Sequence, residues 1–282
     1  MGSEMNIGKG LLGIFLICIT MAMMPLAELL SLTPYQLLVV RGVPAIFFGC
    51  LFGIFDNKNR MGLPDRYTLL SGITFCLACI GLFNAIRAWG INLSAVLLDM
   101  GVLVNFILAI KRGEKLTPLN TGCFVFAIIG SFIAMRGWNT TGISITGLLW
   151  SILALSMNGL FVEFNSKATQ GSYTKICWWG ILLTFTGVLF SINDNVNWSK
   201  FPVSIALLFG VATGAINFFG VILAGKNLKP VWMGTLVMAV TPSILLGSWF
   251  ILKKSLGIDQ LFGVLLMLGV SGYLGYQLNK KV

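Results

Sequence analysis

Two ionisable side chains, Asp99 and Arg41, lie inside apolar stretches long enough to cross a bilayer. From a helical rise of about 1.5 Å per residue, we expect Asp99 roughly 3 Å and Arg41 roughly 5 Å from the bilayer midplane. A charge at that depth costs at least about 2.5 kcal/mol and is a functional candidate by default. A carboxylate can hold and release a proton, whereas a planar guanidinium can bind a carboxylate or a phosphate.

Two interpretations of these charges stay open. Asp99 and Arg41 lie at similar depths, so they are able to form a structural ion pair. Alternatively, Asp99 is the central ionisable group of a functional cycle and Arg41 binds an acidic group of a solute. The chain contains no histidine, so a carboxylate is the ordinary side chain left to titrate near neutral pH.

Uncharged groups within the apolar stretches form a second set of candidates. Asn84 and Asn217 occupy two Gly-x-x-Asn segments, and Asn158 lies in another apolar stretch. Such amides either read polar groups of a solute or hold helices together. Trp150 is able to stack on an aromatic or cationic solute, although most aromatic residues in such a chain face lipid.

Two further carboxylates, Glu28 and Glu163, lie near opposite ends of the first and sixth apolar stretches. They are candidate gate charges. The alternative is that their side chains simply extend to the lipid headgroups, as amphipathic side chains do.

These residues must be positioned by membrane helices. Apolar residues make up 57% of the chain and charged residues only 10%, against about 25% in soluble proteins. A spanning helix needs about 20 apolar residues, which predicts ten spans. We expect them at 10–30, 34–55, 67–89, 92–110, 118–137, 143–166, 173–192, 201–225, 229–252 and 257–278.

The basic residues indicate an orientation rather than a nucleic-acid partner. The net charge is +10, but lysine and arginine lie in short clusters between the apolar stretches. Their bias toward one set of connections predicts a plasma (inner) membrane protein with both termini in the cytoplasm. Lys253 and Lys254 do not fit this bias, because they fall in an expected outer connection.

Weak internal similarity divides the chain into residues 1–137 and 138–282. Gly10-Leu11-Leu12 corresponds to Gly147-Leu148-Leu149, and Gly81-Leu82-Phe83-Asn84 to Gly214-Ala215-Ile216-Asn217. Five spans in each half force the halves into opposite orientations. The expected fold is therefore an all-α membrane protein with ten transmembrane helices in two inverted five-helix repeats.

Three segments resemble the drug/metabolite transporter superfamily, specifically its EamA-type members. They are Leu37–Gly42, the Lys111–Leu116 segment with Gly122, and Thr241-Pro242 with Ser255-Leu256. Ser255 stands where that family usually has glutamate, and Gly101 stands at the place equivalent to Pro242. The resemblance implies a secondary transporter with a central cavity, whose relatives carry amino acids, drugs, choline, nucleotide sugars or other metabolites.

The expected function is alternating-access transport of a small organic metabolite or drug-like solute. An amino acid or another cationic or zwitterionic compound is favoured, with proton coupling left open. The alternatives are carriage of anionic metabolites such as nucleotide sugars, or a non-transporting scaffold or channel. The sequence has no H-E-x-x-H, G-x-S-x-G or P-loop motif, which argues against an enzyme. We expect no cofactor; the expected partners are a small-molecule substrate and the lipid bilayer, and a homodimer is left open.

Overall fold

The computed structural model describes residues 6–30, 32–55, 62–90, 94, 101–111, 113, 118–134, 144–193, 202–228 and 230–279. Every regular element in this part of the chain is a helix. In the first half these are α1 (Ile7–Met21), α2 (Leu26–Leu29), α3 (Pro34–Phe55), α4 (Arg66–Trp89), α6 (Val102–Lys111) and α7 (Pro118–Ala134). In the second half they are α8 (Ile145–Lys167), α9 (Ser172–Asn193), α10 (Val203–Gly210), the π-helix η1 (Val211–Ile216), α11 (Asn217–Asn227), α12 (Pro230–Val237), α13 (Val240–Leu252) and α14 (Ile258–Asn279).

Six helical segments of the described chain are long and apolar enough to cross a membrane. They are Ile7–Leu29, Pro34–Phe55, Arg66–Trp89, Ile145–Lys167, Ser172–Ile192 and Val203–Asn227. Thr121–Ala134, Val240–Leu252 and Ile258–Leu274 are shorter apolar helices. Large apolar side chains also point outward from the bundle, for example Phe55, Phe185 and Leu149. Such a surface suits lipid rather than water.

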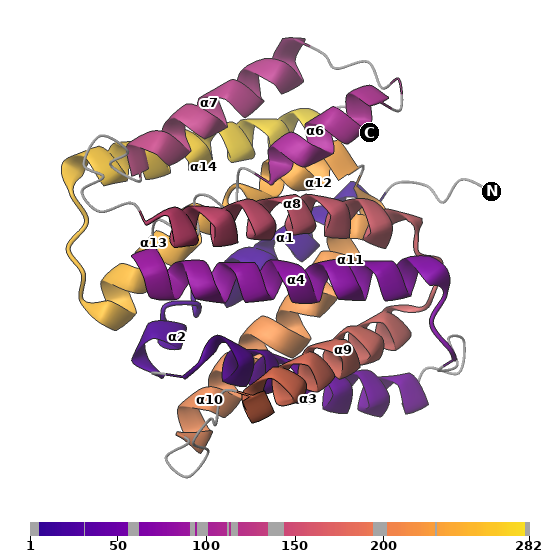
Figure 1. The fold of residues 1–282 in the computed structure, drawn as a ribbon. Helices are drawn as coiled ribbons and strands as arrows, with labels where there is room; N and C mark the ends of the chain where they lie inside the picture. Colours follow the sequence, from indigo (N-terminus) through magenta and orange to yellow (C-terminus); the bar gives the residue numbers. More distant parts are fainter. Residues whose placement is uncertain are drawn as a thin grey trace.

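Four helix pairs make the most extensive contacts: α3 with α9, α4 with α8, α1 with α11, and α7 with α14. Figure 1 shows α4 beside α8 in the middle of the bundle, with α3 and α9 on one side and α7 and α14 on the other. In this view α1 begins, α8 ends and α14 ends toward the right, whereas α8 and α14 begin toward the left. Each of the four helix pairs joins segments that are far apart in the sequence.

Two expected spans are not continuous helices. The span expected at 10–30 is interrupted by a turn at residues 22–25, and the span expected at 229–252 is interrupted at residues 238–239. Proline explains both breaks, because its nitrogen carries no hydrogen and its ring clashes with the carbonyl four residues earlier. Those carbonyls belong to Met21 for Pro25 and to Met238 for Pro242. Each of these two expected spans therefore contains a helix break that ends just before or near a proline.

Pro44 does not break its helix: it lies inside the continuous helix α3. In the span expected at 92–110, helix α6 begins at Val102. Before it, the structure describes Ser94 and Gly101, whereas Asp99 lies outside the described residues.

Asp65 joins two connections at one end of the bundle. Its carboxylate caps α4 by accepting a hydrogen bond from the Thr68 backbone N–H at 2.6 Å. It also accepts hydrogen bonds from the N–H and hydroxyl of Thr169, both at 2.9 Å, in the turn between α8 and α9. Burial opposes its charged form, but the hydrogen bonds from Thr68 and Thr169 outweigh it and lower the pKa of Asp65 to about 2.

We predict that this contact makes stability depend on pH below the ordinary carboxyl pKa of 3.8. A carboxyl group with a lowered folded-state pKa contributes stability above its unfolded pKa and loses it as pH falls through the folded value. The melting temperature should therefore fall between about pH 4 and pH 2. Thermal unfolding of the purified protein in detergent across this range measures the effect.

Two variants separate the contributions of charge and cap. Asp65→Asn keeps a capping oxygen and should flatten the pH dependence between pH 4 and 2. Asp65→Ala also removes the cap and should cost about 0.5–2 kcal/mol at neutral pH. An unchanged slope in Asp65→Asn would contradict the assignment.

Candidate functional site

The guanidinium of Arg41 lies in the interior of the bundle, with 2% of the residue exposed. Arg41 belongs to α3, and its Nε and Nη2 donate hydrogen bonds to the backbone carbonyl of Thr213 at 3.2 and 2.9 Å. Its Nη1 donates to the Cys79 sulfur of α4 at 3.2 Å. One side chain thus joins three helical segments, α3, α4 and η1.

The Thr213 carbonyl accepts these bonds because η1 is a π-helix. In an α-helix, the Asn217 N–H would donate to the Thr213 carbonyl four residues earlier. Here the Asn217 N–H donates to the carbonyls of Ala212 and Gly214 instead. The wider turn bypasses Thr213 and directs its carbonyl to the guanidinium. Such π-segments are rare and often occur at functional sites.

Three aromatic rings surround the same guanidinium. The Arg41 Cζ lies 5.3 Å from the ring centroid of Phe75, and 5.8 Å from those of Phe83 and Phe218. These distances are within the range of a cation–π interaction, which strengthens when water is excluded. Phe75 also packs edge-to-face on Phe218, with 5.0 Å between centroids. The rings therefore join α4 to α11 around a fixed positive charge.

Among the described residues, no carboxylate lies within ion-pair distance of Arg41. Asp99, the expected partner, lies outside the described residues, so the Asp99–Arg41 pair stays a prediction. The described surroundings of Arg41 solvate its charge with a carbonyl, a thiol and aromatic faces.

The amide and aromatic candidates lie on three helices, α4, α8 and α11. Asn217 of α11 is buried and donates from Nδ2 to the Thr20 hydroxyl of α1 at 3.0 Å, so it connects two helices. Asn84 of α4 donates to the Ile80 carbonyl of its own helix at 2.9 Å. Asn158 and Trp150 lie on α8, both half-buried, and Asn158 makes no hydrogen bond to another described residue.

The carboxylate of Glu28 forms an ion pair that links distant parts of the chain. Its Oε2 lies 2.6 Å from the Lys254 Nζ in the connection between α13 and α14. Sequence reasoning identified Glu28 but not this partner. One feature of the sequence does point to Lys254: it lies in an expected outer connection, where the charge bias disfavours a lysine.

Glu163 is buried near the end of α8 and pairs with Lys167 one turn later at 2.8 Å. Close by, the buried Lys175 donates from Nζ to both oxygens of Asn165 and to the Ala168 carbonyl. In the sequence, Lys175 is one of the basic residues between apolar stretches and indicates orientation only. Its three acceptors explain how this cation is accommodated where α8 turns into α9.

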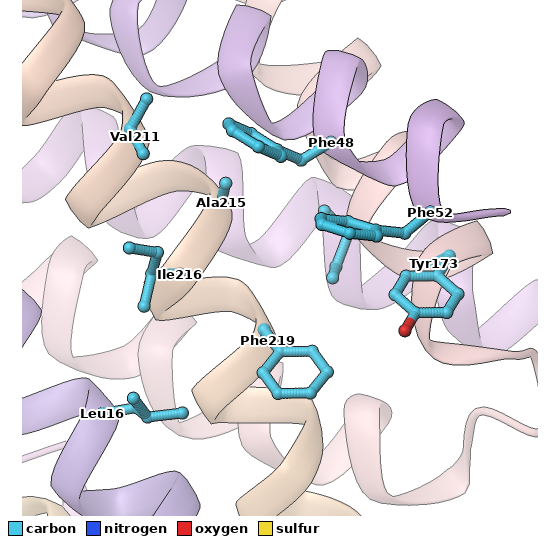
Figure 2. Close-up of a pocket in the computed structure, with 9 residues that line it drawn as sticks. Leu16, Phe48, Phe52, Tyr173, Val211, Ala215, Ile216 and Phe219 are labelled. Atoms are coloured by element: carbon cyan, nitrogen blue, oxygen red, sulfur yellow. The ribbon is translucent and has the colours of Figure 1, made fainter. Parts of the chain in front are cut away.

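A separate apolar pocket of about 480 Å³ opens on the outside of the bundle between α1, α3, α9 and the η1–α11 segment. Figure 2 shows Phe48, Phe52 and Tyr173 on one side of it, facing Val211, Ala215 and Phe219 on the other. Ile216 and Phe52 are 41% and 47% exposed, so the pocket is accessible from the surface. Sequence reasoning did not find this pocket.

The sequence matches no family model and no curated protein. The structure does resemble solved ones. One of them, described only as "Crystal structure of protein", superposes with a TM-score of 0.79 over 98% of this chain and 99% of its own, at 12% identity. At this identity the likeness shows a shared fold and carries no information about activity.

The fold and its surface define the class of this protein. Its described elements are helices, several of them long and apolar, and large apolar side chains face outward. It is an all-helical, membrane-embedded protein.

Proposed function

We propose that this protein is a secondary transporter that moves a small organic solute across the plasma membrane by alternating access. In this proposal it is an EamA-type member of the drug/metabolite transporter superfamily, with ten spans in two inverted halves and both termini in the cytoplasm. The pairing of the helices is the observation that carries the proposal.

An exchange of two five-span halves turns the first span into the sixth and the third into the eighth. The pair α1 with α11 then becomes the pair α8 with α4, and both are among the most extensive contacts of the bundle. The same exchange returns the pairs α3 with α9 and α7 with α14 to themselves. This pattern supports an inverted repeat, an architecture that lets one central site face either side in turn.

Close backbone contacts support the same relationship. A Cβ on Gly81 of α4 would lie 2.7 Å from the Trp150 carbonyl oxygen of α8. A Cβ on Gly220 of α11 would lie 2.9 Å from the Gly13 carbonyl oxygen of α1. Each pair of helices therefore meets at a glycine. In the exchange of halves, these contacts make Gly220 the counterpart of Gly81. The sequence similarity instead matches Gly81 with Gly214, six residues earlier.

The ion pair of Glu28 with Lys254 suits a gate. It links the end of the first span to the connection between the last two, and so bridges the proposed halves. A partly exposed ion pair of this kind contributes only about 0–1 kcal/mol. It is therefore able to form and break as the halves rock.

We infer the substrate class from the buried Arg41 and from the depth that the sequence predicts for Asp99. Asp99 favours a solute with an ammonium group, such as an amino acid or another zwitterion or cation. Arg41 supports a second candidate, an anionic metabolite, because its charge has no carboxylate partner among the described residues. Its burial by Thr213 and the aromatic rings makes the structural role the stronger one, so we place the zwitterionic or cationic solute first.

The proposal is tested with purified protein in liposomes that enclose a pH-sensitive dye. Amino acids, amines, quaternary ammonium compounds and anionic metabolites are added singly, and labelled-solute counterflow follows any hit. We expect saturable flux for an ammonium-bearing solute. Saturable flux for anions alone would support the second candidate. Unsaturable flux would indicate a channel, and no flux or counterflow for any compound would favour a scaffold.

We predict that Asp99→Asn folds but loses pH-dependent transport, because an amide does not take up or release a proton near neutral pH. Flux across a pH series, in liposomes with matched protein content, measures the effect. Asp259→Asn, which changes a carboxylate near the start of α14, is the control and should transport like the unmodified protein. Full activity with unchanged pH dependence in Asp99→Asn would remove Asp99 from the mechanism.

A further inference from the structure

The pocket of Figure 2 combines an apolar floor with basic residues at one end. Its walls belong to segments long enough to span a membrane, and its lining side chains are apolar apart from the Tyr173 hydroxyl, which suits an open side that faces lipid. Phe52, Phe219 and Ile216 line it and are each more than a third exposed. Its volume of about 480 Å³ is in the range of small-molecule sites, roughly 300–1,000 Å³.

Two lysines lie beyond the same end of the pocket. Lys226 follows the lining residue Phe219 on α11, and Lys9 precedes the lining residue Leu16 on α1. Each lysine is about two helical turns from its lining residue and therefore on the same helix face, roughly 10 Å along the axis. Both are exposed.

Hydrogen bonding ties the basic end to the pocket wall. The Lys226 Nζ donates to the Ser172 hydroxyl at 3.0 Å, and Ser172 precedes Tyr173, which lines the pocket. Figure 2 shows the Tyr173 hydroxyl as the polar atom among the labelled side chains. Lys175 lies close enough to Lys226 for their charges to repel. Asp65 is the acidic group that attracts Lys175 electrostatically, and its carboxylate already accepts hydrogen bonds from Thr68 and Thr169.

We propose that this pocket binds one anionic glycerophospholipid. An acyl chain lies among Phe48, Phe52, Val211 and Phe219, and the phosphate contacts Lys226 with Lys9 nearby. Charge complementarity selects this occupant over a neutral lipid, because a lysine near the membrane surface contributes about 1 kcal/mol toward an anionic headgroup. In the orientation proposed above, the site belongs to the cytoplasmic leaflet. Lipid binding does not depend on whether the protein transports a solute.

The site also touches the element that holds Arg41. Val211, Ala215 and Ile216 of η1 line the pocket, while the Thr213 carbonyl of the same π-helix accepts the hydrogen bonds from Arg41. A bound acyl chain packs against this segment from the lipid side. Occupancy should therefore stabilise the folded protein.

The test compares phosphatidylglycerol with phosphatidylcholine of identical acyl chains, added to the delipidated full-length protein in detergent. Native mass spectrometry counts bound lipids, and thermal unfolding reports stabilisation. We expect one phosphatidylglycerol to bind in preference to phosphatidylcholine and to raise the melting temperature. Lys226→Gln should weaken phosphatidylglycerol binding about fivefold and leave phosphatidylcholine unchanged. Ile216→Trp, which fills the pocket, should weaken both lipids.

Two matched substitutions control for general effects. Lys253→Gln removes an exposed lysine remote from the pocket, and Ile205→Trp adds the same bulk to an exposed position of α10 outside it. Both should bind lipid like the unmodified protein. If Ile216→Trp fails to fold, Lys226→Gln at the helix end decides the question.

Three outcomes would overturn the proposal. The first is equal binding of the two lipids, and the second is the same loss of binding in the controls as in the pocket variants. The third is a dimer that becomes monomeric in Ile216→Trp with lipid binding unchanged, which would assign the pocket to a second copy of the chain.

Discussion

Arg41→Ala is expected to lower the stability of the folded protein by about 3–5 kcal/mol, because it combines two losses. Truncation leaves a cavity among Phe75, Phe83 and Phe218, which now surround the guanidinium. It also leaves the Thr213 carbonyl without the two hydrogen bonds from Arg41, in a place that water does not reach. Thermal unfolding in detergent, followed by size-exclusion chromatography, measures the loss.

Two milder substitutions separate volume from charge. Arg41→Met fills much of the space but cannot donate hydrogen bonds, so it should cost about 1–3 kcal/mol, the cost of one unsatisfied buried carbonyl. Arg41→Lys keeps the charge but loses the planar fork that reaches Thr213 through two nitrogens. Arg87→Ala at the exposed end of α4 is the control and should be neutral.

Transport by Arg41→Met then distinguishes the two roles of this residue. We expect the folded variant to keep most of its flux for an ammonium-bearing solute, because Arg41 is occupied by protein groups. A folded Arg41→Met that loses all flux would instead assign Arg41 to the solute. Arg41→Ala with unchanged stability would contradict the structural role itself.

Much of the helical layout follows from local sequence. Runs of apolar residues predict α3, α4, α8 and α9 to within a few residues, because a spanning helix needs length and apolarity, and both are visible in sequence. Proline within a spanning segment permits a bend, yet Pro44 lies inside a continuous helix and shows that proline alone does not predict a break. Whether a helix continues depends on what packs against the freed carbonyl.

The surroundings of Arg41 could not be predicted from local sequence. The π-helix η1 has an ordinary apolar sequence, and the Thr213 carbonyl that its widened turn bypasses is paired with a guanidinium from a residue far earlier in the chain. The Lys254 partner of Glu28 likewise lies more than two hundred residues away. Neither follows from spacing, because both depend on how helices pair in space. Asp99 lies outside the described residues, so its depth and its partner stay predictions.

Gly214→Ala is expected to destabilise the protein by about 1–3 kcal/mol, although the same change usually favours a helix. A Cβ at Gly214 would run into the backbone carbonyl of Arg41, so α3 and η1 would have to move apart. The Arg41–Thr213 hydrogen bonds depend on that approach and should weaken with it. A larger side chain, as in Gly214→Val, should prevent accumulation of folded protein.

Gly272→Ala supplies the matched control. Gly272 lies in α14, and a Cβ there would meet nothing within 4 Å. Helix propensity alone predicts that this substitution is neutral or stabilises by up to about 1 kcal/mol. Opposite shifts in melting temperature for the two Gly→Ala variants would assign the cost at Gly214 to the contact with α3. Equal shifts would mean that the two segments separate without a penalty and that Arg41, rather than the glycine, determines their spacing.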